Sequence, residues 1–208
     1  MDSNALYYVH DPMCSWCWGY QPTWQKIKQS LPEGVTLQYL VGGLAPDSDV
    51  PMPEPMQHQI AAYWRKIEDY LGTEFNHDFW RDNTPRRSTY PACRSVLAAR
   101  AQNAEQAMIT AIQQAYYLHA KNPSNVDVHI GLAQQLNLNV EQFTRDMASS
   151  ELNQQLLDEI AFARSIGGNS FPSLFLKTAQ GITELPIDYQ ESAKTLAQID
   201  ALLAESFI

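Results

Sequence analysis

Apolar residues form four short β-favouring runs, two near the start of the chain and two near its end. These runs predict strands at residues 5–10, 35–41, 173–178 and 181–185. The first run is ended by Asp11-Pro12 and the second by Gly42-Gly43, which are both turn signals. Between these two strands the sequence predicts a helix, in which Pro22 either introduces a kink or begins a second helix.

From about residue 46 to about residue 166 the apolar positions change to the spacing of three and four that is typical of amphipathic helices. After a Pro-rich loop, three such stripes predict helices that pack into a helical subdomain, at residues 56–71, 108–116 and 152–163. A further helix is expected to begin after Thr89-Tyr90, and a last one covers 196–203. The predicted order is strand, helix, strand, helical block, strand, strand, helix.

Composition and charge narrow the function classes. The 208 residues include 45% hydrophobic residues, which is typical of a globular protein with a core. A net charge of −9 makes a nucleic-acid partner unexpected. Residues 1–9 lack the basic and apolar regions of a secretory signal, and no apolar stretch approaches the roughly 20 residues of a membrane span. We therefore expect a cytoplasmic protein with no membrane association.

Two cysteines three residues apart follow the first predicted strand, in Cys14-Ser15-Trp16-Cys17. At the start of a helix, free backbone amides and the helix dipole stabilise a thiolate, so Cys14 is the candidate nucleophile. The spacing also lets Cys17 attack a mixed disulfide on Cys14 and release the substrate. Because the sequence has neither a second Cys-x-x-Cys nor paired histidines, we expect no metal site.

The segment Asp11-Pro-Met-Cys-Ser-Trp-Cys-Trp-Gly19, together with Ser170-Phe-Pro-Ser173 before a strand, resembles the DsbA family of thioredoxin-like oxidoreductases. Within that family it is similar to the FrnE-like cytoplasmic branch, whose members are described as protein disulfide isomerases. The resemblance implies an α/β, thioredoxin-like fold with a large all-helical insertion. It divides the chain into a discontinuous thioredoxin-like domain, residues 1–45 and 167–208, and a helical insertion subdomain, residues 46–166.

The resemblance also implies roles for residues outside the cysteine pair. Pro172 would be a cis-proline facing the cysteines, and the Phe171 backbone would pair with an incoming peptide. Independently of the resemblance, the position of Trp16 next to Cys17 predicts that an exposed Trp16 offers apolar contact to substrates. The expected partners are thiol- or disulfide-containing proteins or small thiols. No bound cofactor is expected. Glutathione is a candidate reducing co-substrate.

The expected function is that of a disulfide oxidoreductase or isomerase, and two alternatives stay open. One is a glutathione-dependent transferase or isomerase of the kappa or 2-hydroxychromene-2-carboxylate isomerase type. These enzymes generally carry a serine in place of the redox pair, so the presence of Cys14 and Cys17 argues against this alternative. The other is a chaperone-like binding module without enzymatic activity, in which the cysteines are incidental.

Several nearby residues have a structural and a functional interpretation. Cys93 is interpreted as a small buried apolar residue, with a redox or substrate-contact role as the alternative. Asp11 is interpreted as a turn residue or helix-start charge, with proton transfer to Cys17 as the alternative. Trp18, Trp24 and Trp64 are expected to pack in the core.

Overall fold

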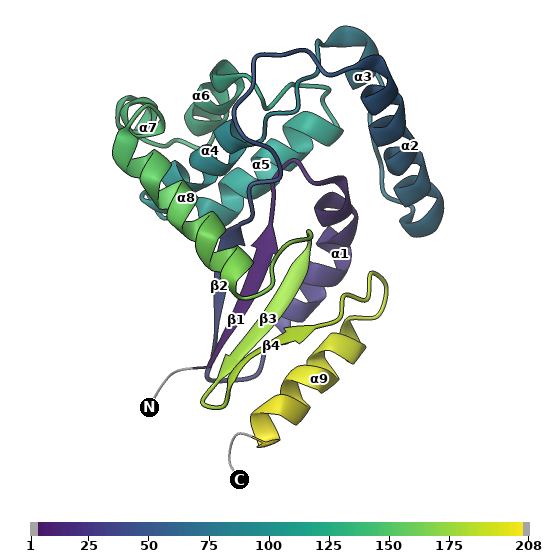
Figure 1. Ribbon diagram of the computed structural model, residues 1–208, viewed down its shortest axis with the longest axis vertical. Helices are drawn as coiled ribbons and strands as arrows, with labels where there is room; N and C mark the ends of the chain where they lie inside the picture. Colours follow the sequence, from purple (N-terminus) through teal and green to yellow (C-terminus); the bar gives the residue numbers. More distant parts are fainter. Residues whose placement is uncertain (1–3, 206–208) are drawn as a thin grey trace.

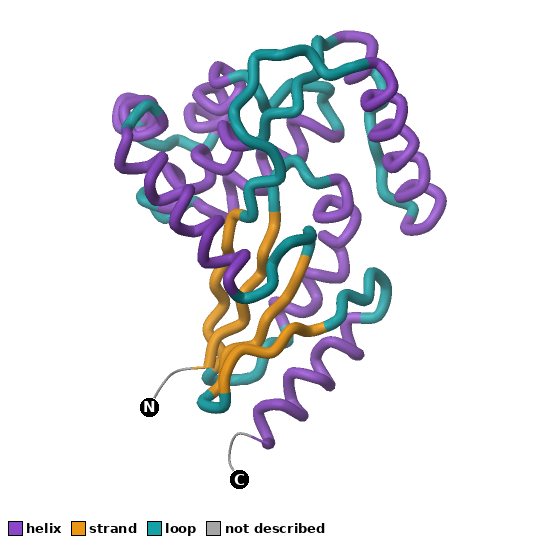
Figure 2. Tube along the Cα trace, in the orientation of Figure 1, coloured by secondary structure: helices purple, strands orange, loops and turns teal. Residues whose placement is uncertain are grey.

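A computed structural model describes residues 4–205 and contains a four-stranded sheet in the order β2-β1-β3-β4. The strands are β1 (Asn4–His10), β2 (Val35–Val41), β3 (Ser173–Thr178) and β4 (Gly181–Leu185). β1 pairs with β2 in parallel and with β3 antiparallel, and β3 pairs with β4 antiparallel. All four predicted strands are confirmed, and Figure 2 shows them together at one end of the molecule.

Helices occupy most of the rest of the described chain. They are α1 (Ser15–Gln29), α2 (Glu54–Leu71), α3 (Phe79–Asp82), α4 (Tyr90–Arg100), α5 (Glu105–Tyr117), α6 (Val126–Gln135), α7 (Val140–Met147), α8 (Ser150–Ser165) and α9 (Ser192–Glu205). The predicted helical block and element order are confirmed. The suggestion that Pro22 begins a second helix is wrong, because α1 runs through it. Proline lacks an amide hydrogen, so α1 tolerates one missing hydrogen bond there.

The central strand β1 is buried on both faces, so it reads as a continuous apolar run rather than an alternating one. On one face, Trp24 of α1 stacks on Tyr8 with 4.3 Å between ring centroids. On the other face, Phe162 of α8 meets the edge of Tyr7 at 5.5 Å. Figure 1 shows α1 and α8 on opposite sides of the sheet. The end of β1 is therefore enclosed, which fixes the direction in which the following cysteine segment leaves the sheet.

The core is continuous between the sheet and the helical block. One hydrophobic cluster includes Leu6 and Tyr8 of β1 together with Trp64 of α2 and Ile112 of α5. Trp24 and Trp64 are fully buried, which confirms their expected packing role. All helices from α2 to α8 lie between β2 and β3 in the chain. The division into domains at residues 46 and 166 stays a prediction.

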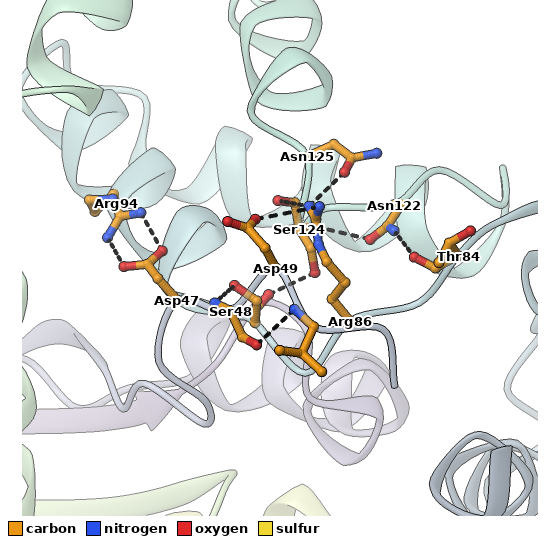
Figure 3. A network of polar contacts seen from close by, with 11 residues as sticks. Asp47, Ser48, Asp49, Thr84, Arg86, Arg94, Asn122, Ser124 and Asn125 are labelled. Carbon is orange, nitrogen blue, oxygen red and sulfur yellow. Dashed lines mark hydrogen bonds and ion pairs between the residues drawn. The ribbon is translucent and has the colours of Figure 1, made fainter. Parts of the chain in front are cut away.

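A polar network fixes the loop between β2 and α2 to the helical block (Figure 3). Arg94 of α4 forms two hydrogen bonds with the Asp47 carboxylate, at 2.6 and 2.8 Å. Arg86 donates to the Ser124 carbonyl and to Asn125 Oδ1, both at 2.7 Å. These contacts are charge-assisted and hold three loop segments in one arrangement. The loop between β2 and α2 is thus held against α4.

No helix within residues 4–205 is both long enough and apolar enough to span a membrane.

His10, the last residue of β1, is fully buried, and neither ring nitrogen has a hydrogen-bond partner among the described residues. Its ring stacks on Tyr8 at 5.4 Å and meets Tyr39 at 5.7 Å. Burial, and secondly the positive charge of Arg100, lowers the pKa of His10 from 6.5 to about 3. His10 is therefore neutral in the folded protein at pH values where an unfolded chain protonates it.

We predict that this histidine makes the protein acid-sensitive. As pH falls from 6.5 toward 3, the unfolded state binds a proton that folded His10 does not, so the free energy of unfolding falls by at most about 1.4 kcal/mol per pH unit for this residue. Urea unfolding of the wild type and of His10→Phe at several pH values measures this slope. The slope should be shallower in His10→Phe and unchanged in His58→Gln, which alters an exposed histidine. Equal slopes in all three proteins would contradict the prediction.

Candidate active site

Cys14 is the N-cap residue of α1. Its backbone is extended, with φ −82° and ψ 117°, and its carbonyl accepts the first helical hydrogen bond from the Trp18 amide at 3.1 Å. Its own amide donates to the Asp11 carbonyl at 3.0 Å, which closes the turn after β1. The first amides of the helix have no intrahelical acceptor, and the Cys14 side chain makes no capping hydrogen bond. The sulfur therefore lies beside free donors and the positive end of the helix dipole.

The two cysteines of the motif differ in access to solvent. Cys14 is 8% exposed and Cys17 is fully buried, and both are free thiols. Burial, and secondly the hydrogen bond with Cys14, raises the pKa of the Cys17 thiol well above its usual range. In this arrangement Cys14 is the sulfur that an external molecule can reach.

The loop before β3 faces Cys14. The Cys14 thiol donates a hydrogen bond to the Phe171 carbonyl at 3.4 Å. The Phe171-Pro172 peptide bond is cis, which confirms the predicted isomer and the predicted position opposite the cysteines. Residues more than 150 positions apart in the chain thus meet at one sulfur.

The position of Phe171 depends on Gly42, the residue after β2. A Cβ atom placed on Gly42 would lie 1.9 Å from Cε1 of the Phe171 ring, far inside van der Waals contact. The ring therefore packs directly against the glycine backbone. The sequence indicated Gly42 only as the end of a strand. The structure shows that the missing side chain of Gly42 leaves the space that the Phe171 ring fills.

A pocket of about 490 Å³ opens beside Cys14. Trp16 and Phe171 line it on the side of the cysteines, and Met56, Ile60 and Tyr63 of α2 line it on the other. Trp16 is half-buried, with its ring 5.1 Å from that of Tyr189. The apolar stripe of α2 was expected to pack within the helical subdomain, but Met56 and Tyr63 are 36% and 43% exposed. Part of the stripe is therefore a pocket wall.

Asp11 holds the surroundings of the cysteines together. Its carboxylate accepts hydrogen bonds from the Met13 amide at 2.8 Å, the Leu44 amide at 2.7 Å and the Thr89 hydroxyl at 2.7 Å. Met13 belongs to the cysteine turn, Leu44 follows β2, and Thr89 precedes α4. The bond to Met13 fits the predicted turn role. The bonds to Leu44 and Thr89 come from distant segments and have no local sequence signal.

Burial raises the pKa of Asp11, and its hydrogen bonds oppose that shift. The Cys93 thiol donates to the same carboxylate at 3.5 Å. Cys93 is fully buried, and burial together with the Asp11 charge raises the pKa of its thiol well above the usual range. Cys93 is therefore a buried, protonated neighbour of Asp11, in agreement with its structural interpretation.

The structure brings all five predicted site residues together. Those residues are Cys14, Cys17, Trp16, Phe171 and Pro172.

Trp18 is half-buried and stacks on Tyr117 at 5.7 Å, so it packs at the edge of the core. The sequence did not indicate a role at the site for Thr89, which donates to Asp11, or for Arg87, which lines the pocket beside Cys14. Within residues 4–205 no group of three or more Cys, His, Asp or Glu side chains could hold a metal ion.

The fold and the cysteine pair together define a class, the thioredoxin-like proteins with a Cys-x-x-Cys motif at the start of a helix. A family model described as thioredoxin matches residues 7–192, so the chain belongs to that family. Two solved structures match the fold of this chain over nearly its whole length. A "putative protein disulfide isomerase" from Nitrosomonas europaea has a TM-score of 0.84 and 26% identity, covering 98% of this chain and 99% of that chain. The cytosolic disulfide reductase DsbM from Pseudomonas aeruginosa has a TM-score of 0.75 and 23% identity, covering 98% of both chains.

Curated relatives carry a different description. The ClpXP adapter protein SpxH of Bacillus subtilis is 23% identical over 172 residues, which are 81% of this chain and 56% of that protein. SpxH of Halalkalibacterium halodurans is 23% identical over 150 residues, 69% of this chain and 49% of that protein. The chain thus spans about half the length of the curated relatives it matches. The thioredoxin family is confirmed by the family model, and the predicted DsbA-like arrangement is confirmed at the level of the fold.

We predict that Gly42→Ala destabilises the protein by displacing the Phe171 ring. The added methyl group overpacks this contact, so the free energy of unfolding should fall by about 1–3 kcal/mol. Gly131→Ala in α6 is the matched control, because its Cβ would meet nothing within 4 Å. That variant should be neutral or more stable by up to about 1 kcal/mol. Urea unfolding of both variants measures the difference, and equal stabilities would contradict the described Phe171 contact.

Proposed function

We propose that this chain catalyses thiol–disulfide exchange, with Cys14 as the attacking thiol and Cys17 as the resolving thiol. The observation that carries the proposal is the asymmetry of the pair. Cys14 lines a pocket at the start of a helix, opposite the cis-Pro172 loop, whereas Cys17 is fully buried behind it. A nucleophile needs access to the substrate, and a resolving thiol needs access only to the mixed disulfide.

The exchange proceeds in two steps. The Cys14 thiolate bonds to one sulfur of a substrate disulfide, and the other sulfur leaves as a thiolate that takes up a proton from solvent. Burial raises the pKa of Cys17, so this thiol stays protonated while the mixed disulfide forms. Cys17 then loses its proton and attacks the Cys14 sulfur, which releases the second substrate thiol and forms the Cys14–Cys17 disulfide. Run in reverse, the same steps oxidise a dithiol.

Substrate contacts are proposed for three residues around Cys14. The carbonyl of Phe171 lies 3.4 Å from the Cys14 sulfur, and this proximity supports the proposed pairing of the Phe171 backbone with a bound peptide. Pro172 keeps that backbone turned toward the sulfur, and Trp16 offers an apolar surface in the pocket. The proposed substrates are proteins or small molecules that carry thiols or disulfides. Isomerisation of protein disulfides would use the same steps.

Two structures of one neighbouring protein support a cytosolic reducing role. DsbM of Pseudomonas aeruginosa is described as a cytosolic disulfide reductase. Its structure with GSH matches this chain with a TM-score of 0.74 and 22% identity. We therefore propose the cytosol as the compartment and glutathione as a reducing co-substrate.

We predict that the two cysteines give opposite trapping behaviour. With Cys93 also replaced by Ser, Cys17→Ser should accumulate mixed disulfides on Cys14, because no internal thiol resolves them. Cys14→Ser should lose turnover without comparable trapping, because Cys17 is buried. Non-reducing electrophoresis and mass spectrometry after incubation with a disulfide substrate measure the adducts. Adducts on Cys17 alone would reverse the roles, and no adducts in either variant would overturn the proposed exchange.

A binding role is the second candidate, because two curated relatives are described as ClpXP adapter proteins. In that case the apolar pocket wall formed by Met56, Ile60 and Tyr63 would hold a protein partner. We predict that a Cys14→Ser, Cys17→Ser double variant loses the cellular function if exchange underlies it. Complementation of a deletion strain tests this. Full complementation by the double variant would favour the binding role, and a Cys93→Ser strain is the control for replacing a buried cysteine.

A further inference from the structure

The pocket beside Cys14 has a positive character in an acidic protein. Among the described residues that line it, Arg87 carries a charge and there is no aspartate or glutamate. The Nζ atom of Lys66 lies 5.9 Å from the ring of Trp16, which is one of the residues that line the pocket. The whole chain has a net charge of −9. The local charge therefore favours an anionic ligand where the average charge of the surface would repel one.

Within residues 4–205 the Arg87 guanidinium makes no hydrogen bond or ion pair, and its side chain is exposed in the pocket. Its positive charge opposes the larger effect of burial on the pKa of Tyr116, without a direct polar contact. The neighbouring Arg86 differs, because its guanidinium donates to Ser124 and Asn125 within the network of Figure 3. Two adjacent arginines thus divide into one that holds loops together and one that is available to a ligand.

We propose that Arg87 binds a carboxylate of a small disulfide, of the size and charge of glutathione disulfide, while Cys14 attacks the disulfide sulfur. This inference rests on the proposed function and names its substrate class. A planar guanidinium forms paired hydrogen bonds with a carboxylate. The pocket volume of about 490 Å³ lies within the range of small-molecule sites, which favours a small disulfide over an acidic protein segment.

The chemical step balances without a further reactant. The Cys14 thiolate, whose proton has gone to solvent, forms a bond to one sulfur of the small disulfide as the original S–S bond breaks. The departing thiolate takes up a proton from solvent. Arg87 keeps its charge throughout and acts by binding, so it determines specificity for the carboxylate and does not move a proton.

The test compares two disulfides in a Cys17→Ser, Cys93→Ser background, where a single adduct forms on Cys14. The probes are glutathione disulfide, which carries carboxylates, and bis(2-hydroxyethyl) disulfide, which is uncharged. Stopped reactions analysed by mass spectrometry give the second-order rate constant for each probe. We expect Arg87→Gln to lower the rate constant for glutathione disulfide about tenfold and that for the neutral disulfide less than twofold. Arg87→Lys, which keeps the charge but not the planar geometry, should lie between the wild type and Arg87→Gln.

Arg145→Gln, which removes an exposed positive charge on α7, is the matched control and should change neither rate constant. Raising the salt concentration should slow the reaction of glutathione disulfide with the background protein that retains Arg87, and should have little effect on the Arg87→Gln variant. Equal losses for both probes would overturn the specificity role of Arg87. A larger loss with a peptide disulfide flanked by glutamates would assign Arg87 to acidic protein segments and overturn the small-molecule assignment. No adduct with either probe in the Arg87 background would instead overturn the proposed function.

Discussion

The buried carboxylate of Asp11 is the interaction on which the rest of the site depends. A carboxylate inside a protein is costly unless its oxygens are hydrogen-bonded, and here its donors come from the cysteine turn, the loop after β2 and the start of α4. Satisfying this one group therefore requires three separate segments of the chain to meet. Each of these segments also supplies part of the site. The hydrogen bonds that offset the free-energy cost of burying the Asp11 carboxylate therefore form only when the segments around Cys14 have come together.

The central strand sets the geometry that Asp11 then fixes. β1 is covered by α1 on one face and α8 on the other, so the chain can leave its end only toward the helical block. Gly42 at the neighbouring end of β2 leaves space for the Phe171 ring, and the Phe171 carbonyl then meets Cys14. Because Gly42 has no side chain, the Phe171 ring can pack against the end of β2, and the cis-Pro172 loop lies next to the Cys14 sulfur. The position of this loop therefore depends on the glycine at the end of β2.

The local parts of this site could be predicted from the sequence, and the parts that depend on distant contacts could not. The strands and the helix after Cys14 have clear periodic and turn signals, and the family motif places Phe171 and Pro172. α6 escaped prediction because its few buried residues include the polar His129, so its apolar stripe is weak. α7 is amphipathic but has 8 residues, of which only Phe143 and Met147 are buried, so its pattern is too short to stand out. Nothing in the sequence shows that Thr89 meets Asp11 from 78 positions away, nor that Arg86 is bonded while Arg87 is not. Such differences arise only when loops far apart in sequence pack together.

The contrast between Cys14 and Cys17 follows from the same packing. The rings of Tyr8 and Tyr117 are fully buried, and negative charge on either cysteine raises the pKa values of both phenols, after the larger effect of burial. Their hydroxyl groups have no hydrogen-bond partner among the described residues and lie in a medium that solvates charge poorly. Negative charge is thus costly at the fully buried Cys17, and less so at Cys14, which reaches solvent and the free amides of α1. Two chemically identical thiols acquire different roles because one faces the aromatic core and the other faces the pocket.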